Sequence, residues 1–238
     1  MNQLVLFCGG PTIYPGTVPK PLQVMASGRT LLEWYLSTPF TAAFQSVVLL
    51  CEDHNFEQFK RLTGTLESQR DMQVVSTPEG STTLAKLQNY VEESKGDATL
   101  TCTYPDIFFA GTYRAPGRDY DWDHRITLGI RPLSSRFPTL MVDPYSGLVQ
   151  SITYHHPAVP ANPVHIFGGM LIAKAATLSR LLAEFRDYNS GRRATLEFET
   201  FGWMINLGIA DSTLLEGHWF QADGPRQIEE IKLHFGLA

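Results

Sequence analysis

The sequence predicts an α/β fold in which a mostly parallel sheet is flanked by helices. Short, continuous apolar runs alternate along the chain with stretches whose apolar residues recur at helical spacing. Such alternation is typical of parallel strands joined by right-handed helical crossovers. The run from Leu4 to Cys8 is apolar throughout and ends at two glycines, as expected of a strand that is buried on both faces.

The further elements are predicted from the same two patterns, in chain order. Strands are expected at the short apolar runs 46–51, 72–76, 98–104, 125–132 and 164–172. Helices are expected where apolar residues recur at helical spacing, at 30–36, 57–66, 83–94, 175–188, 195–207 and 227–235. The segment 140–154 predicts two strands joined by the DPYSG turn at 143–147. We expect a loop or an irregular helix at 107–125, which is rich in Tyr, Arg and Asp.

Composition indicates a single domain over residues 1–238 and excludes several classes of function. The chain has 238 residues, of which 43% are hydrophobic and 18% charged, so it has ample material for a core. A net charge of −5 argues against a nucleic-acid groove, which needs a dense surface of Lys and Arg. No apolar run approaches the roughly 20 residues that span a bilayer. We therefore expect neither nucleic acid nor a membrane as a partner.

Cysteine usage predicts a reducing compartment. Cys8, Cys51 and Cys102 are far apart in the sequence and lie in apolar runs, so we expect buried, reduced thiols. The first ten residues lack the basic segment of a secretory signal. Together these features predict a cytoplasmic protein, and they leave its oligomeric state, including a homo-oligomer, open.

A glycine- and proline-rich turn, residues 9–22, follows the first strand. Glycines at this place let the backbone approach a ligand and present N–H donors to phosphates. Lys20 lies between two prolines, which restrict the backbone that carries its ammonium. The alternative interpretation is a plain connection between a strand and a helix, because neither a Walker-type motif nor a dinucleotide-binding GxGxxG is present.

Two aspartates are candidates for a magnesium site. Asp106 follows a buried strand, and Asp223 follows an aromatic cluster near the end of the chain. Ligands of parallel sheets bind beyond the carboxyl ends of the strands, where Asp106 is expected to lie. Two carboxylates that converge there could hold Mg²⁺ together with substrate phosphates. The alternative is that Asp106 caps a helix and Asp223 shapes a turn.

Short motifs along nearly the whole chain resemble, in order and spacing, those of the sugar-phosphate nucleotidyltransferases, most closely the glucose-1-phosphate cytidylyltransferases. The first half carries GG (9–10), PKPL (19–22), Gly28, LLEWYL (31–36), TPEGSTTLAKL (77–87) and TYPD (103–106). The second half carries RFP (136–138), GLVQS (147–151), FGG (167–169), TLEFE (195–199) and WFQAD (219–223). The resemblance implies a Rossmann-like sheet of the nucleotide-diphospho-sugar transferase type, with a nucleotide-binding half (1–106) and a sugar-binding half (107–238).

The resemblance also implies an activity and the residues that serve it. A sugar 1-phosphate would attack the α-phosphate of a nucleoside triphosphate, with CTP favoured, and pyrophosphate would leave. By position in the motifs, Lys20 is the catalytic cation, and Asp106 and Asp223 hold Mg²⁺. The nucleotide-binding positions are Cys8, Gly9, Gly10, Thr83, Lys86 and Tyr104. The substrate-binding positions are Arg136, Gly168, Gly169 and Glu197.

Four positions depart from the family's pattern. The GxGTR segment is replaced by PTIYPGT and loses its Arg, and EKP is replaced by His155-His156-Pro157 and loses its Lys. Phe167 and Pro105 replace an Asn and a Gly. Arg136, Lys86, a protonated His156 or the pair 192–193 could supply the missing charge. The alternatives are an enzyme with another acceptor, and a catalytically silent relative that binds nucleotide or sugar phosphate or serves in an assembly.

Positive charge is concentrated locally although the chain is acidic. The first 50 residues contain two basic residues, Lys20 and Arg29, and one acidic residue, Glu33. Residues 107–142 contain five Arg and three Asp. The aromatic and Arg-rich segment 113–125 predicts either a lid over the substrate or a partner surface, with an ordinary exposed loop as the alternative.

Overall fold

The chain folds into two compact units built around parallel and antiparallel strands. The computed structural model describes residues 2–9, 18–25, 27–66, 71–94, 96–113, 120–132, 138–153 and 164–237. The first unit comprises Met1–Ser81, Cys102–Gly111 and Gly217–Ala238, and the second comprises Thr82–Thr101 and Thr112–Glu216. Three strands contribute residues to both units: β4 (Thr99–Thr103), β5 (Ile107–Tyr113) and β10 (Ala210–Gln221).

The first unit is an α/β layer with the strand order β3-β2-β1-β4, in which β1, β2 and β3 are parallel. Its remaining elements are β1 (Asn2–Phe7), η1 (Lys20–Leu22), α1 (Leu31–Leu36), α2 (Pro39–Ala42), β2 (Ser46–Glu52), η2 (Asp53–Asn55), α3 (Phe56–Thr65), β3 (Asp71–Thr77) and α7 (Pro225–Phe235). Leu4 pairs with Val47, and both are buried, as are the residues that follow them up to Phe7 and Cys51. This continuous burial explains why β1 and β2 read as unbroken apolar runs.

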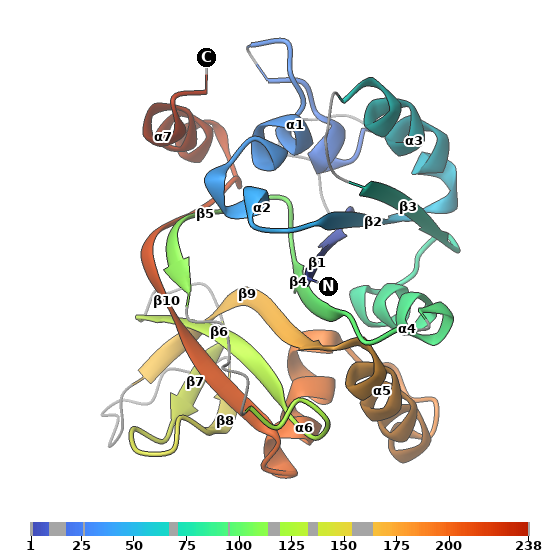
Figure 1. The fold of residues 1–238 in the computed structure, drawn as a ribbon, viewed down its shortest axis with the longest axis vertical. Helices are drawn as coiled ribbons and strands as arrows, with labels where there is room; N and C mark the ends of the chain where they lie inside the picture. Colours follow the sequence, from blue (N-terminus) through green and yellow to red (C-terminus); the bar gives the residue numbers. More distant parts are fainter. Residues whose placement is uncertain are drawn as a thin grey trace. The chain divides into compact units, whose positions relative to one another are not determined.

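The second unit contains most of the antiparallel pairing. Its elements are α4 (Thr83–Glu93), β6 (Ile126–Pro132), β7 (Thr139–Val142), β8 (Val149–Thr153), β9 (Val164–Lys174), α5 (Ala175–Asn189), the π-helical turn η3 (Leu196–Thr200) and α6 (Phe201–Asn206). Strand β6 is parallel to β10 and antiparallel to β9, and β7 pairs with both β8 and β9. Helices α4 and α5 pack side by side (Figure 1).

The predicted elements are confirmed along most of the chain, including the hairpin of β7 and β8 around residues 143–147. The prediction for 107–125 is wrong at its start, because Ile107–Tyr113 is strand β5. The apolar run at the start of this segment is short, and the polar residues after Tyr113 dominate the pattern of the segment as a whole. Strand β10 was not predicted, since its residues are only partly buried and do not alternate regularly between buried and exposed.

Cys8, Cys51 and Cys102 are buried, as predicted, and none of them forms a disulfide with another described cysteine. No helix in the described part of the chain is long and apolar enough to cross a bilayer.

Strand β10 needs glycine at position 217, where it passes β5. Gly217 has a φ of +115°, in a region that L-residues rarely adopt. A Cβ at this position would lie 2.5 Å from the carbonyl oxygen of Ala110 and 2.8 Å from Cα of Gly111. The close approach of the two strands therefore depends on the absence of a side chain.

We expect Gly217→Ala to lower the free energy of unfolding by about 2–4 kcal/mol, because it combines left-handed backbone strain with a steric clash. The control is Gly208→Ala, at a φ of +69° with no atom within 4 Å of the added Cβ. It should cost about 1 kcal/mol, from strain alone. Urea unfolding measures both, and equal losses would contradict the close approach.

Candidate functional site

The ammonium of Lys20 lies between two carboxylates that come from distant parts of the chain. Its Nζ is 2.7 Å from Oδ2 of Asp106 and 3.1 Å from Oδ1 of Asp223. The side chains of Lys20, Asp106 and Asp223 are 8%, 17% and 32% exposed, so the contacts are shielded but open to solvent on one side. The structure thus brings the predicted catalytic lysine and the two predicted metal ligands into one charged cluster in the first unit.

The short helical turn η1 positions Lys20. Pro19 and Pro21 restrict the backbone on both sides of it, and the N–H of Leu22 donates to the carbonyl of Pro19 over 2.9 Å. Lys20 is buried together with Pro21 and Leu22. The stem of its side chain is therefore packed, and the ammonium at its end lies at the two carboxylates.

Backbone pairing brings the two aspartates together. Asp106 follows β4 and precedes β5, whereas Asp223 follows β10. The N–H of Ala222 donates to the carbonyl of Asp106 over 2.8 Å, which ties the two segments directly. The alternative in which Asp106 caps a helix is wrong, because the residues after it form a strand.

The charges within the cluster favour a protonated lysine. Burial works against the ammonium, but Asp106 and then Asp223 outweigh it through charge and hydrogen bonds, and the pKa of Lys20 rises above its ordinary value. Lys20 is therefore a cation throughout the physiological range. It compensates two negative charges that would otherwise repel each other.

Tyr35 lies behind the cluster and was not among the predicted site residues. Its side chain is 1% exposed, and its ring packs edge-on against that of Phe108. Burial, and then the proximity of Asp106 and Cys8, raises the pKa of its hydroxyl well above the ordinary range, so the phenol stays neutral. In the sequence it is one more apolar-face residue of a helix, a pattern that predicts core rather than site.

The carboxylate pair fits a magnesium ion. Both side chains reach one atom, Nζ of Lys20, so their oxygens converge, and carboxylate oxygens are the ligands that Mg²⁺ prefers. Among the described residues, no group of three or more His, Cys, Asp and Glu side chains is placed to hold a metal. Because Mg²⁺ loses its bound water reluctantly, proteins commonly bind it through one or two carboxylates together with substrate phosphates.

The predicted nucleotide-binding residues of the first unit lie at the carboxyl ends of β1 and β4. Cys8 is buried, and its N–H donates to the carbonyl of Leu50 over 2.8 Å, whereas Gly9 is half-buried. The ring of Tyr104 packs against that of Phe7, with centroids 5.2 Å apart. Gly10 lies outside the described residues. Nucleotide contacts of these residues stay a prediction.

The other two predicted nucleotide-binding residues belong to the second unit. Thr83 is the first residue of α4, and Lys86, one turn later, is 5% exposed. Burial of the Lys86 side chain makes it part of the packing of the helix.

Gly168 and Gly169, which are predicted to lie near the sugar, are required by the local structure of the sheet. They lie where the pairing of β9 with β6 shifts its register, and Gly169 has a φ of +76°. A Cβ on Gly168 would lie 2.6 Å from Cδ1 of Leu215 and 3.3 Å from the carbonyl oxygen of Gly129. Glycine is thus needed for this β-bulge, a feature that is common beside active sites.

The acidic pair of the TLEFE motif divides into two roles. Glu199 accepts hydrogen bonds from the N–H and hydroxyl of Thr195 at 2.8 and 2.7 Å, and these bonds lower its pKa. Glu199 thus caps the start of η3. Glu197 is half-buried on the same π-helical turn and stays the predicted substrate ligand. Single π-helical turns are frequent at functional sites.

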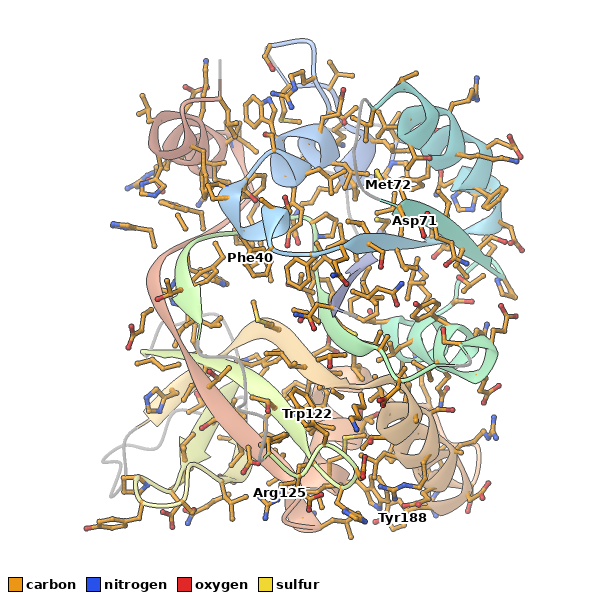
Figure 2. The ribbon with its side chains drawn as sticks, viewed as in Figure 1. Phe40, Asp71, Met72, Trp122, Arg125 and Tyr188 are labelled. Atoms are coloured by element: carbon orange, nitrogen blue, oxygen red, sulfur yellow. The ribbon has the colours of Figure 1, made fainter. Side chains whose placement is uncertain are left out.

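The remaining cationic candidates are only partly described. Arg125, labelled in Figure 2, forms an ion pair with Asp211, with 3.0 Å between Nη1 and Oδ1. Its charge is therefore already compensated within the second unit. Arg136, His155, His156 and the part of the aromatic segment from 114 to 119 lie outside the described residues.

Comparison with solved structures confirms the predicted fold. The chain is similar to the inositol-1-phosphate CTP transferase from T. maritima, with a TM-score of 0.74, 10% identity and coverage of 99% of this chain and 96% of that one. It is also similar to the UDP-glucose pyrophosphorylase from Acinetobacter baumannii, with a TM-score of 0.70, 14% identity and coverage of 100% and 94%. No family model matches the chain, and no curated protein matches it significantly. The chain therefore shares its fold with these two enzymes.

We expect Lys20→Met to lower the free energy of unfolding by about 3 kcal/mol, because it leaves two shielded carboxylates uncompensated. The matched control is Lys174→Met. Lys174 also bridges two aspartates, Asp97 and Asp123, but these are 83% and 75% exposed, so the loss should stay below about 1 kcal/mol. Chemical denaturation without divalent cations measures both. Similar losses would contradict a special role for the Lys20 cluster.

The same pair of proteins tests the pKa of Lys20. Because that pKa is raised in the folded protein, the ion pairs contribute fully below the unfolded value near 10.5 and are lost as the pH rises through the raised value. The difference in unfolding free energy between wild type and Lys20→Met should therefore be constant around neutral pH and shrink only in strong alkali. A decline that begins near neutrality would show that Lys20 is not held as a cation.

Proposed function

We propose that the chain is a nucleotidyltransferase that moves a nucleotidyl group, with CMP favoured, from a nucleoside triphosphate to a sugar 1-phosphate and releases pyrophosphate. The observation that carries the proposal is the convergence of Lys20, Asp106 and Asp223 at one point. A cation and two potential metal ligands at the end of parallel strands are suited to bind phosphates. The fold shared with solved enzymes of this chemistry supports the proposal.

The reaction needs positioning and charge stabilisation more than proton transfer. The attacking oxygen belongs to the sugar phosphate and is already anionic near neutral pH, so no general base is required. A bond forms between this oxygen and the α-phosphorus, the bond to the pyrophosphate oxygen breaks in line, and pyrophosphate carries away the electron pair. Negative charge accumulates on the nonbridging oxygens, where fixed positive charge is most effective.

The chain's own residues supply part of that charge. We infer that Lys20, a fixed cation, donates hydrogen bonds to the phosphates, and that Asp106 and Asp223 hold Mg²⁺. When bound, Mg²⁺ neutralises phosphate charge and orients the triphosphate. Backbone groups of Gly9 and Gly10 would receive the nucleotide, as would Thr83, Lys86 and Tyr104. Gly168, Gly169, Glu197 and Arg136 would contact the sugar phosphate.

A second candidate function is a catalytically silent relative that binds nucleotide or sugar phosphate, or takes part in an assembly. The loss of the Arg of the glycine-rich loop and of the Lys of EKP favours it. A charge-assisted contact to phosphate contributes about 1.5–3 kcal/mol, so two lost contacts cost on the order of a hundredfold or more unless other cations replace them. A third candidate, between the active sugar-1-phosphate transferase and the silent relative, is an active transferase with a different acceptor.

Incubation with CTP, Mg²⁺ and glucose 1-phosphate should release pyrophosphate, measured in a coupled phosphate assay. We expect Asp106→Asn to lower the rate by roughly a hundredfold or more, because it removes a carboxylate ligand of the metal and a partner of Lys20. The control Asp71→Asn changes an exposed aspartate on β3, labelled in Figure 2, and should leave the rate unchanged.

The same assay with other nucleoside triphosphates and other sugar phosphates separates the candidate functions. Release with another triphosphate or another sugar phosphate would correct the specificity but keep the reaction. No release with any combination would exclude both enzyme functions. In that case, a rise in melting temperature with a nucleotide would identify the silent, ligand-binding relative, because a ligand that binds only the folded state stabilises it.

A further inference from the structure

A hollow of about 240 Å³ lies in the second unit, between the first turns of α4 and the C-terminal end of α5. Its floor is apolar and includes Leu84 and Ala85 of α4 and the buried ring of Phe185 of α5. Three arginines line it: Arg186, Arg192 and Arg193. Figure 1 shows the two helices side by side, and Figure 2 labels Tyr188, which lies on α5 close to this end.

A tight turn at the end of α5 brings the last two arginines to the hollow. Ser190 and Gly191 adopt left-handed conformations with φ of 51° and 73°, so the chain reverses directly after the helix. The N–H of Arg192 donates to the carbonyl of Asn189 over 3.1 Å, and the side-chain amide of Asn189 donates to the carbonyl of Arg192. The backbone that carries these two guanidinium groups is therefore fixed by hydrogen bonds.

The charge on the lining is positive and incompletely compensated. Arg186 forms an ion pair with Glu92 at 2.6 Å, whereas Arg192 and Arg193 form no ion pair within the described parts of the chain. No acidic residue is among the described residues that line the hollow. In a chain with a net charge of −5, two consecutive exposed arginines beside a third place like charges together, an arrangement that a bound anion would stabilise.

We propose that this hollow binds a small phosphate-bearing anion. The planar guanidinium group pairs with two phosphate oxygens at once, and two or three such groups around one hollow match the geometry of a phosphate or pyrophosphate. The volume lies below the usual range for larger organic ligands, which favours a small anion over a whole nucleotide. The apolar floor lowers the local dielectric constant and so strengthens the charge interactions, and the positive end of α4 adds to them.

The hollow is distinct from the predicted nucleotide-binding positions on the same helix. Helical spacing places Ala85 and Gln88 on the face that lines the hollow. Thr83, Lys86 and Tyr90 lie on the opposite face, and Lys86 and Tyr90 are buried there. The proposed anion site therefore does not depend on whether the chain transfers nucleotides.

Isothermal titration calorimetry with inorganic pyrophosphate, without divalent cations and at constant chloride concentration, tests the proposal. We expect Arg192→Gln/Arg193→Gln to weaken one binding event at least tenfold. The control Arg180→Gln/Arg226→Gln removes the same charge from exposed arginines of α5 and α7 outside the hollow and should bind as the wild type does. Ala85→Phe fills the hollow without a change in charge and should also weaken binding.

Further titrations distinguish the ligands and the sites. Inorganic phosphate and glucose 1-phosphate separate an inorganic anion from a sugar phosphate as the preferred ligand. Absence of binding to the wild type, or equal weakening by the control pair, would overturn the proposal. If the Arg192→Gln/Arg193→Gln variant binds pyrophosphate as tightly as the wild type does, the two arginines do not form an anion site and the proposal is wrong.

Discussion

The ammonium of Lys20 compensates two carboxylates that the fold forces together at the end of parallel strands. Without it, Asp106 and Asp223 would face each other in a partly shielded place where repulsion is stronger than in water. The same three charges are what phosphate chemistry needs, namely one cation for the phosphates and two ligands for a metal.

Two backbone features hold that arrangement. The prolines around Lys20 fix the turn that carries it, and a hydrogen bond from Ala222 to the carbonyl of Asp106 joins the segments of the two aspartates. Farther along β5 and β10, Gly217 permits the close approach of the two strands. Residues outside the charged cluster therefore help to place its charges. The second unit uses glycine in the same way, at the bulge formed by Gly168 and Gly169.

Much of the fold could be predicted because continuous apolar runs and helical periodicity are local signals. Strands β5 and β10 could not, since β5 is short of apolar residues after Phe109 and β10 is half-exposed. Lys20, Asp106 and Asp223 could be named from motifs, but 86 and 203 residues separate Lys20 from its partners, and only pairing across the sheet brings them together. Tyr35 could not be predicted, because a buried aromatic residue on a helix gives the same sequence pattern whether or not it lies near a functional site. The cationic hollow depends on a turn after α5, which has no motif of its own.

A titration of the protein with Mn²⁺, a paramagnetic substitute for Mg²⁺, tests most directly whether Asp106 and Asp223 hold a metal ion. Free ion is measured by electron paramagnetic resonance in the presence and absence of CTP. We expect one site per chain, which Asp106→Asn and Asp223→Asn both weaken. We also expect Lys20→Met to bind Mn²⁺ more tightly without CTP, because the ammonium no longer competes for the carboxylates. If all three variants bind Mn²⁺ as the wild type does, the cluster is a structural ion pair and not the centre of a phosphate-binding site.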